Sequence, residues 1–520
     1  MLGHEIQDLK RISTWFRDLP GEKGFDEVLS SLNRMVITSS QDEVYRAKLA
    51  GQEEIWINIG NCLDEFSEAV TSIPEIKDCS VRIVRGIVLL ARNLAVHDKK
   101  ITQELSIVTK SINTFNNLAA VSSHSDMKAA LYLTMLEFFC NAFKSVPDVT
   151  EVDFNNLTLF LLYPLEEDMD ISREERFLVL LNILASQENS LSRMLKSGDS
   201  LDVFSTVIVR EILLKTLEIS ASNDHSAHQN FPSRTLLAIS VFKKFVCHES
   251  FAIYILSLQA NDEQRLLNYL KASQLVLTST SDWNNHELTG IMTWCLATLK
   301  NLNYDVQRYF KLEQDSEDHA LPLHQKLLAT LDILTALSQF EQVRQYMSFY
   351  NGIEVIIDIL RCLHENAIRF QIIRSTAGQV SKIKAFNNMG RRIEDPEKFK
   401  KRIDSVTGKI NATNFPECKL LLVEVLSFLV FEQTKAQDAV REAGGLQLIL
   451  SNCLIDDNDP FIKERCITCI KFLLQNNTEN QNIVRDLEAQ SVVQDDALEA
   501  AGLQVSLDSS GKLFINEPRE

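Results

Sequence analysis

The spacing of apolar residues predicts helices along most of the chain. Residues 418–431 (CKLLLVEVLSFLVF) place apolar groups on every side of a helix, which requires neighbouring elements on several sides. A polar turn, a short amphipathic piece and the pair Gly444-Gly445 follow. The next apolar residues lie at the spacing i, i+3, i+4, i+7 of a one-faced helix: Leu446, Ile449, Leu450 and Cys453.

The acidic stretch 456–459 comes directly before another amphipathic pattern. We expect Asp459 to be the N-cap of that helix and Pro460 its first residue, because a carboxylate accepts unpaired N–H groups and proline lacks one. A calcium loop is the alternative. It is disfavoured because Phe461 and Ile462 stand where a ligand and a glycine are needed.

Several of these patterns recur at the spacing of helical repeats. Asn93 lies at the end of one strongly apolar helix, and the next two comparable helices contain Asn141 and Asn182, at intervals of 48 and 41 residues. Leu429 and Leu473 are 44 residues apart, and a glycine-marked corner at 352 returns 93 residues later, at 445. Armadillo and HEAT units are about 40–47 residues long. The sequence therefore predicts an all-α, armadillo/HEAT-like α-solenoid of degenerate repeats.

Composition shifts suggest three parts. Residues 1–313 would form an N-terminal lobe and residues 323–484 a C-terminal lobe, with the acidic break 313–322 as the boundary. A basic insertion, 361–409, interrupts the second lobe. In the tail, 485–520, alternation at 503–507 and 512–515 around a turn at 508–511 predicts a small β-hairpin. Because a lone hairpin is marginal in water, we expect it to dock onto the last helices.

The residues LILSNCLIDDNDPF and the later NTENQ closely resemble the C-terminal domain of the ataxin-10 family, whose fungal members are also called copper transport protein 86. The resemblance is strong over about the last fifth of the chain and extends into the hairpin. It implies an armadillo-like, non-enzymatic protein linked to cytokinesis and cell survival. The second family name raises the alternative of copper homeostasis through Cu(I)-binding cysteines.

The composition agrees with helical repeats. The chain has 520 residues, 45% of them hydrophobic, but only 16 glycines and 10 prolines, which is poor in turn formers for a sheet protein. A net charge of −18 argues against general binding to nucleic acid or anionic membranes. The start of the chain shows no signal sequence, and the longest apolar run, 420–431, is too short for a membrane span. We therefore expect a cytoplasmic protein.

Cys466-x-x-Cys469 is the candidate metal site. Thiolates suit Cu(I), but a lone pair supplies too few ligands, and no second cysteine pair, histidine cluster or methionine-rich run stands nearby. The ten cysteines are scattered and mostly occupy apolar helix faces. A core position is therefore favoured for both thiols, and no metal or cofactor is expected.

The basic insertion holds the candidate partner-binding residues. They are Lys382, Lys384, Arg391, Arg392, Lys398, Lys400, Lys401 and Arg402. A positive patch in an acidic protein can attract acidic or phosphorylated segments of another protein. The alternative is a solvated, partly disordered insertion whose charges offset the acidic lobes. Only Phe386 and Phe399 interleave with the basic residues, so single-stranded nucleic acid is not an expected partner.

No catalytic motif is present: the chain has no P-loop, dinucleotide fingerprint, HExxH or nucleophile elbow. The leading interpretation is a non-enzymatic scaffold or adaptor for other proteins, with its oligomeric state open. A nuclear import adaptor would line its groove with tryptophans at repeat intervals. Trp15 and Trp56, 41 residues apart, are the one such pair, which is too few.

Overall fold

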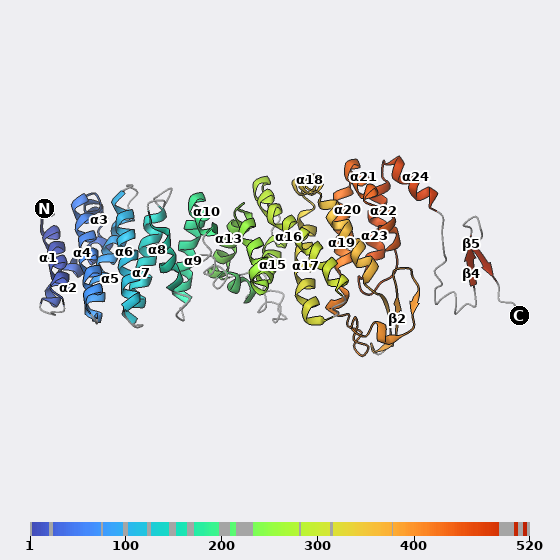
Figure 1. Cartoon of the computed structure of the whole chain (residues 1–520). Helices are drawn as coiled ribbons and strands as arrows, with labels where there is room; N and C mark the ends of the chain where they lie inside the picture. Colours follow the sequence, from blue (N-terminus) through green and yellow to red (C-terminus); the bar gives the residue numbers. More distant parts are fainter. Residues whose placement is uncertain are drawn as a thin grey trace. The chain divides into compact units, whose positions relative to one another are not determined.

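The computed structural model describes residues 3–19, 24–73, 76–96, 102–121, 126–144, 152–163, 171–196, 208–214, 232–279, 282–312, 316–376, 378–487, 504–507 and 513–516. These residues are mostly helical (Figure 1). The chain divides into two compact units, Met1–Tyr254 and Ile255–Glu520. The predicted all-α solenoid class is confirmed. The acidic break 313–322 lies within the second unit, and its last residues belong to a helix, so a lobe boundary there stays a prediction.

Most of the described helices of the first unit lie in two rows. Its described helices are α1 (Gly3–Arg17), α2 (Phe25–Gln41), α3 (Glu43–Ala50), α4 (Glu53–Ser72), α5 (Asp78–Leu94), α6 (Thr102–Val121), α7 (Asp126–Lys144), α8 (Phe154–Leu162), α9 (Ile171–Ala185), α10 (Glu188–Lys196) and α13 (Ser233–Cys247). One row consists of α1, α4, α6 and α8, each packed on the next, and the other of α2, α5, α7, α9 and α13. Each helix therefore touches mainly its predecessor and successor, as in a solenoid.

The three asparagines that mark the sequence repeat each form a hydrogen bond between neighbouring helices. The Asn93 amide donates to Val36 O at 3.1 Å, joining α5 to α2. The Asn141 amide donates to Arg92 O at 3.1 Å, joining α7 to α5. Asn182 Oδ1 accepts from Lys244 Nζ at 2.7 Å, joining α9 to α13. The repeat markers are therefore polar links along one row of the core.

The second unit begins within α14 (Phe251–Asn261), which crosses the division between the units. Its other helices are α15 (Glu263–Thr278), α16 (Asn285–Lys311), α17 (Glu317–Leu337), α18 (Glu341–Phe349), α19 (Gly352–Asn366), α20 (Cys418–Val430), α21 (Thr434–Glu442), α22 (Gly445–Ser451), α23 (Ile462–Leu474) and α24 (Thr478–Asp486). Here α15, α17, α20 and α23 form one row, each packed on the next. No helix among the described residues is long and apolar enough to cross a membrane.

The end of this unit contains a regular repeat. Helices α20 and α23 are both 13 residues long and begin 44 residues apart. Helices α21 and α24 are both nine residues long and also begin 44 residues apart. The residues after α20 and α23 match as well, since Glu432 and Asn476 have positive φ angles of 55° and 56°. The predicted 44-residue spacing is therefore a structural repeat.

The longer spacing of 93 residues has a separate cause. Helix α19 starts at Gly352 after the left-handed Asn351, and α22 starts at Gly445 after the left-handed Gly444. Between α19 and α20 the chain leaves the solenoid to form an antiparallel sheet of β1 (Arg369–Arg374), β2 (Val380–Phe386) and β3 (Arg392–Ile393), in the order β1-β2-β3. An additional segment of about one repeat length thus separates two otherwise consecutive units.

The predicted C-terminal hairpin is confirmed as β4 (Gln504–Leu507) paired antiparallel with β5 (Leu513–Asn516). Its expected turn, 508–511, lies outside the described residues, and its docking onto the last helices stays a prediction. The sheet of the basic insertion was not expected. The segment that sequence reasoning treated as helical-repeat interruption or partly disordered chain contains a folded module instead.

Candidate protein-binding site

The basic insertion folds around a small apolar core of its own. Phe370, Ala385, Phe399 and Ile403 are buried together, and Ile372, Ile383 and Ile410 pack against them. Strands β1 and β2 are rich in β-branched and aromatic residues, which favour a half-buried sheet. The segment after β3 crosses this core through a short 3-10 helix, Pro396–Lys398, and the bridge Ile403–Ile410. We call residues 368–414 the inserted module.

The outer edge of β1 is attached to the acidic loop between α22 and α23. The Phe370 amide donates to Asp456 Oδ1 at 3.1 Å, and Phe370 O accepts from the Asp457 amide at 2.8 Å. The Ile372 amide donates to Asp457 Oδ2 at 2.5 Å. An edge strand with unpaired backbone groups attracts other strands. Here the loop pairs three backbone groups of that edge, at Phe370 and Ile372, and fixes the module to the last repeats.

A buried ion cluster at the start of α20 stabilises the same loop. Lys419, at the start of α20, lies 2.8 Å from Asp456 Oδ2 and 3.3 Å from Asp459 Oδ2, and all three side chains are almost fully buried. Burial lowers the pKa of the Lys419 ammonium, but the carboxylates of Asp459 and Asp456 outweigh it and raise that pKa. Burial raises the pKa of the Asp459 carboxyl, against the opposing effect of Lys419. The ammonium thus stays charged and holds both carboxylates.

The predicted role of Asp459 is wrong. Helix α23 begins at Ile462, after Phe461 in the left-handed region at φ 68°, so neither Asp459 nor Pro460 starts it. The Asp459 carboxylate instead accepts from the Leu420 amide at 3.1 Å, at the first turn of α20, one repeat earlier. The carboxylate does accept an N–H in the first turn of a helix, as predicted, but that helix is α20 and not α23.

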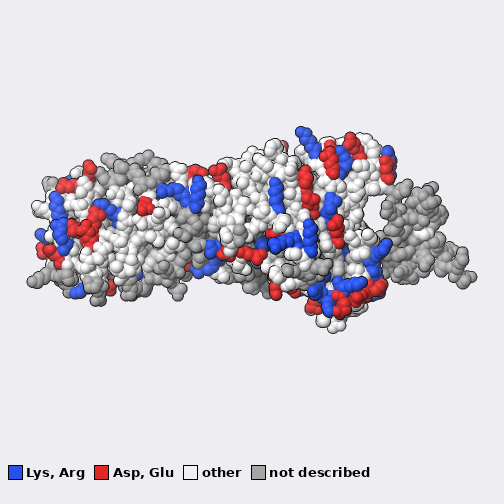
Figure 2. Space-filling view, in the orientation of Figure 1, with Lys and Arg blue, Asp and Glu red and all other residues white. Residues whose placement is uncertain are grey.

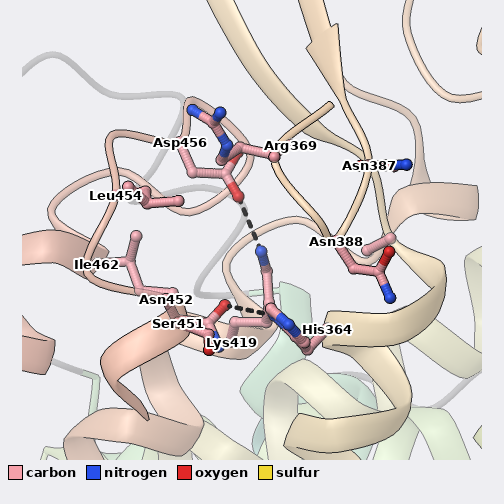
Figure 3. A pocket seen from close by; sticks show the side chains of 12 residues that line it. His364, Arg369, Asn387, Asn388, Lys419, Ser451, Asn452, Leu454, Asp456 and Ile462 are labelled. Atoms are coloured by element: carbon pink, nitrogen blue, oxygen red, sulfur yellow. Dashed lines mark hydrogen bonds and ion pairs between the residues drawn. The ribbon is translucent and has the colours of Figure 1, made fainter. Parts of the chain in front are cut away.

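A small polar cavity lies where the module meets the repeats (Figure 3). Its volume is about 30 Å³, which accommodates water and no larger ligand. Lys419 and Asp456 line one side, and His364 Nδ1 lies 3.4 Å from Asn452 Oδ1. Burial lowers the pKa of His364, so this imidazole is neutral at pH 7. The cavity is part of the joint between module and solenoid.

The structure separates the eight candidate basic residues into two groups. Lys384 and Arg402 are buried; the Arg402 guanidinium donates to Thr413 O and lies 5.6 Å from the centre of the Phe310 ring. Both residues are therefore structural parts of the module. The other six are exposed: Lys382, Arg391, Arg392, Lys398, Lys400 and Lys401.

Acidic side chains of the module offset part of this positive surface. Lys400 pairs with Glu397, and Arg392 lies 3.4 Å from Glu394. Figure 2 shows basic and acidic side chains next to each other over the region where Figure 1 places β2. The strongest candidates for contacts with another molecule are therefore Lys382, Arg391, Lys398 and Lys401.

Phe386 and Phe399, the two aromatic residues that interleave with the candidate cations, make contacts within the module. Phe399 is 7% exposed, and the Arg369 guanidinium lies 4.0 Å from the centre of the Phe386 ring.

Next to β1, a groove of about 370 Å³ is lined by apolar Ile372 and Ile410 and by the charged Arg374 and Glu417. This concave surface beside the module was not predicted from the sequence.

The cysteine motif lies in the core. Cys466 and Cys469 are both fully buried on α23. Burial raises the pKa of the Cys469 thiol to about 12, and a hydrogen bond with Cys453 raises that of Cys466. Among the described residues, no group of three or more histidines, cysteines or acids is arranged to hold a metal ion.

The family motifs are likewise part of the framework. Asn477 and Asn480, from the NTENQ stretch, are buried, and their amides donate to Gln437 Oε1 at 3.2 Å and to Leu473 O at 2.9 Å. These bonds join α24 to α21 and α23, in adjacent repeats. The residues that carry the sequence resemblance thus hold the last repeats and the inserted module together.

Comparison with known proteins agrees with this arrangement. The profile of the spinocerebellar ataxia type 10 protein domain matches residues 418–516. The chain is 33% identical to the ataxin-10 homolog of Candida glabrata over 99% of both chains. It is 31% identical to that of Saccharomyces cerevisiae over 95% of this chain and 92% of the relative.

More distant similarities are partial or weak. Ataxin-10 of Xenopus tropicalis is 31% identical over 20% of this chain and 21% of its own length. A solved structure from work on the interaction between cadherin and beta-catenin covers 92% of this chain at 10% identity and a TM-score of 0.29, too low to carry a functional argument. The identity of 33% and 31% to the two yeast proteins extends over nearly the whole length of each chain, and it is sufficient: the chain belongs to the ataxin-10 family.

Proposed function

We propose that this protein is a cytoplasmic, non-enzymatic scaffold that binds other proteins through its inserted module and takes part in the regulation of cytokinesis and cell survival. Membership of the ataxin-10 family supports a protein-interaction scaffold in general terms. Stacked helical repeats bury a continuous core and leave long surfaces that suit contacts with other proteins. The cellular role is the one that the family resemblance implies.

The observation that carries the proposal is the rigid support of the exposed cations. Lys382 lies on β2 and Arg391 immediately before β3, while Lys398 and Lys401 lie around the 3-10 helix. Cations on a folded sheet lose less conformational freedom on binding than cations on a disordered chain. In a chain of net charge −18 they form a local positive surface that would attract an acidic or phosphorylated segment.

A charge-reversal variant tests this site. Changing Lys382, Arg391, Lys398 and Lys401 to glutamate should weaken binding of acidic partners. Exposed ion pairs contribute ~0.5 kcal/mol each, so the loss for four of them corresponds to roughly 30-fold weaker binding. Affinity purification with quantitative mass spectrometry would compare the variant with the wild type.

A second variant controls for the change in net charge. Lys48, Lys144, Lys300 and Lys435 are exposed on helices that do not belong to the module. Their change to glutamate alters the net charge by the same amount and should leave the partners unchanged. Equal recovery of every partner by the wild type and the module variant would remove the inserted module as the binding site.

Copper handling is the alternative function, and it rests on the Cys466-x-x-Cys469 motif and the half-buried Cys453 beside it. Because two of these thiols are fully buried with raised pKa values, we expect the purified protein to hold no stoichiometric copper. Metal analysis of wild type and Cys466→Ser, after Cu(I) loading and dialysis, decides the matter. One equivalent of copper that is lost in the variant would establish the alternative.

A further inference from the structure

Among the described residues, less covers the outer face of α23 than covers the equivalent face of α20, one repeat earlier. The 44-residue repeat places Ile467, Ile470 and Leu474 of α23 at the positions of Val423, Leu426 and Val430 of α20. The three α20 residues are 0% exposed, in a helix that packs against α23. In α23, by contrast, Ile467 is 54% exposed and the other two are only half-buried.

The solenoid therefore presents an apolar stripe where a further repeat would begin. Terminal repeats of solenoids normally carry a polar outer face or a capping element, because an open end exposes core-type residues. The last described helix of the unit, α24, packs on α21 and α23 and still leaves Ile467 exposed. We therefore expect one more structural element to pack against the outer face of α23.

We propose that the hairpin β4–β5 is this element and covers the α23 stripe in place of a next repeat. The family profile matches residues 418–516, a range that begins with α20 and ends with the hairpin, so both belong to the same family domain. In the hairpin register, the wholly apolar pairs Val505–Ile515 and Leu507–Leu513 alternate with the pairs Gln504–Asn516 and Ser506–Phe514, each of which contains a polar residue. Alternation of this kind is typical of a strand pair with one face on a core.

The dimensions suit this arrangement. Ile467 to Leu474 covers roughly 10 Å along the axis of α23, and four residues of strand span roughly 13 Å. Sixteen residues separate Leu487 from Gln504, and such a segment reaches up to roughly 50 Å. The hairpin can therefore return to the outer face of α23 without any change in the helices.

Hydrogen exchange on the full chain tests the proposal directly. A free two-stranded hairpin is marginal in water, so its amides exchange quickly unless it is docked. We expect the inter-strand amides of 504–507 and 513–516 to exchange at least ~10-fold more slowly than in an unstructured peptide, and Ile467→Lys to abolish this protection. Because Ile467 is already half exposed, the variant should keep the wild-type protection of α20.

A matched control and a concentration series complete the test. Val44→Lys changes another exposed apolar residue, 78% exposed on α3, and should leave the hairpin protected. Fast exchange of the hairpin in the wild type, or unchanged protection in Ile467→Lys, would overturn the proposal. Protection that falls on dilution, together with a dimer in light scattering, would show that the stripe and the hairpin meet between two copies, which also overturns an intrachain cap.

Discussion

Replacing Lys419 by methionine is expected to lower the free energy of unfolding of the C-terminal repeats by about 3–5 kcal/mol. The substitution keeps the length of the side chain but leaves Asp456 and Asp459 buried without their shared cation. Two uncompensated carboxylates at 4% and 0% exposure must then take up protons or open the loop. Hydrogen exchange of the α20 and α23 amides measures the effect locally, without assuming that both units unfold together.

The repeat itself supplies the control for this experiment. Lys463 occupies the position of Lys419 in the next repeat and is exposed, so Lys463→Met should change the stability by less than about 0.5 kcal/mol. Adding Asp456→Asn and Asp459→Asn to Lys419→Met should recover part of the loss, because no charge is then buried. Equal effects of Lys419→Met and Lys463→Met on stability would contradict the inference that the buried ion cluster stabilises the C-terminal repeats.

Replacing Trp56 by alanine is expected to destabilise the first unit by about 3–5 kcal/mol. The indole is 0% exposed, and its Nε1 donates to Ala50 O at 2.9 Å, at the end of α3. Truncation removes a large packed side chain and leaves a cavity between helices that cannot close completely. Thermal unfolding followed by circular dichroism, with hydrogen exchange of α4 and α6 as the local probe, gives the size of the loss.

Trp56→Phe separates packing from hydrogen bonding at the same position. It retains most of the apolar contact but removes the N–H donor together with a small part of the packed ring volume, so it should cost about 1–2 kcal/mol. A neutral Trp56→Ala would mean that the side chain is not part of the core and would return it to consideration as a groove residue. Trp15 and Trp56 are both buried, which places this pair of tryptophans inside the first unit.

Features that depend on local periodicity could be predicted from the sequence. Helix α20 is apolar all round because it packs on α17, α19 and α23, and that environment was inferred from its residues alone. The asparagine spacing predicted a repeat. In the structure, the amides of Asn93 and Asn141 each link one helix to its neighbour in the row. The alternation around residue 505 predicted the hairpin.

The inserted module could not be predicted in the same way, although β1 and β2 carry a readable signal. Arg369–Arg374 and Val380–Phe386 are rich in isoleucine, valine and phenylalanine, but their many lysines and arginines made the segment look solvated. Which cations are exposed depends on the register, since Lys384 points inward and Lys382 does not. The partner of Asp459 was missed because its contact with Leu420 spans 39 residues of sequence.

The module leaves and re-enters the solenoid at a single point. The Ile368 amide donates to Asn414 Oδ1 at 2.9 Å, and the Asn414 amide donates back to Ile368 O at 2.8 Å. Insertions whose ends meet are tolerated well, because the surrounding helices need not move apart. The meeting of its two ends therefore allows the module to change in length or sequence without any movement of α19 and α20.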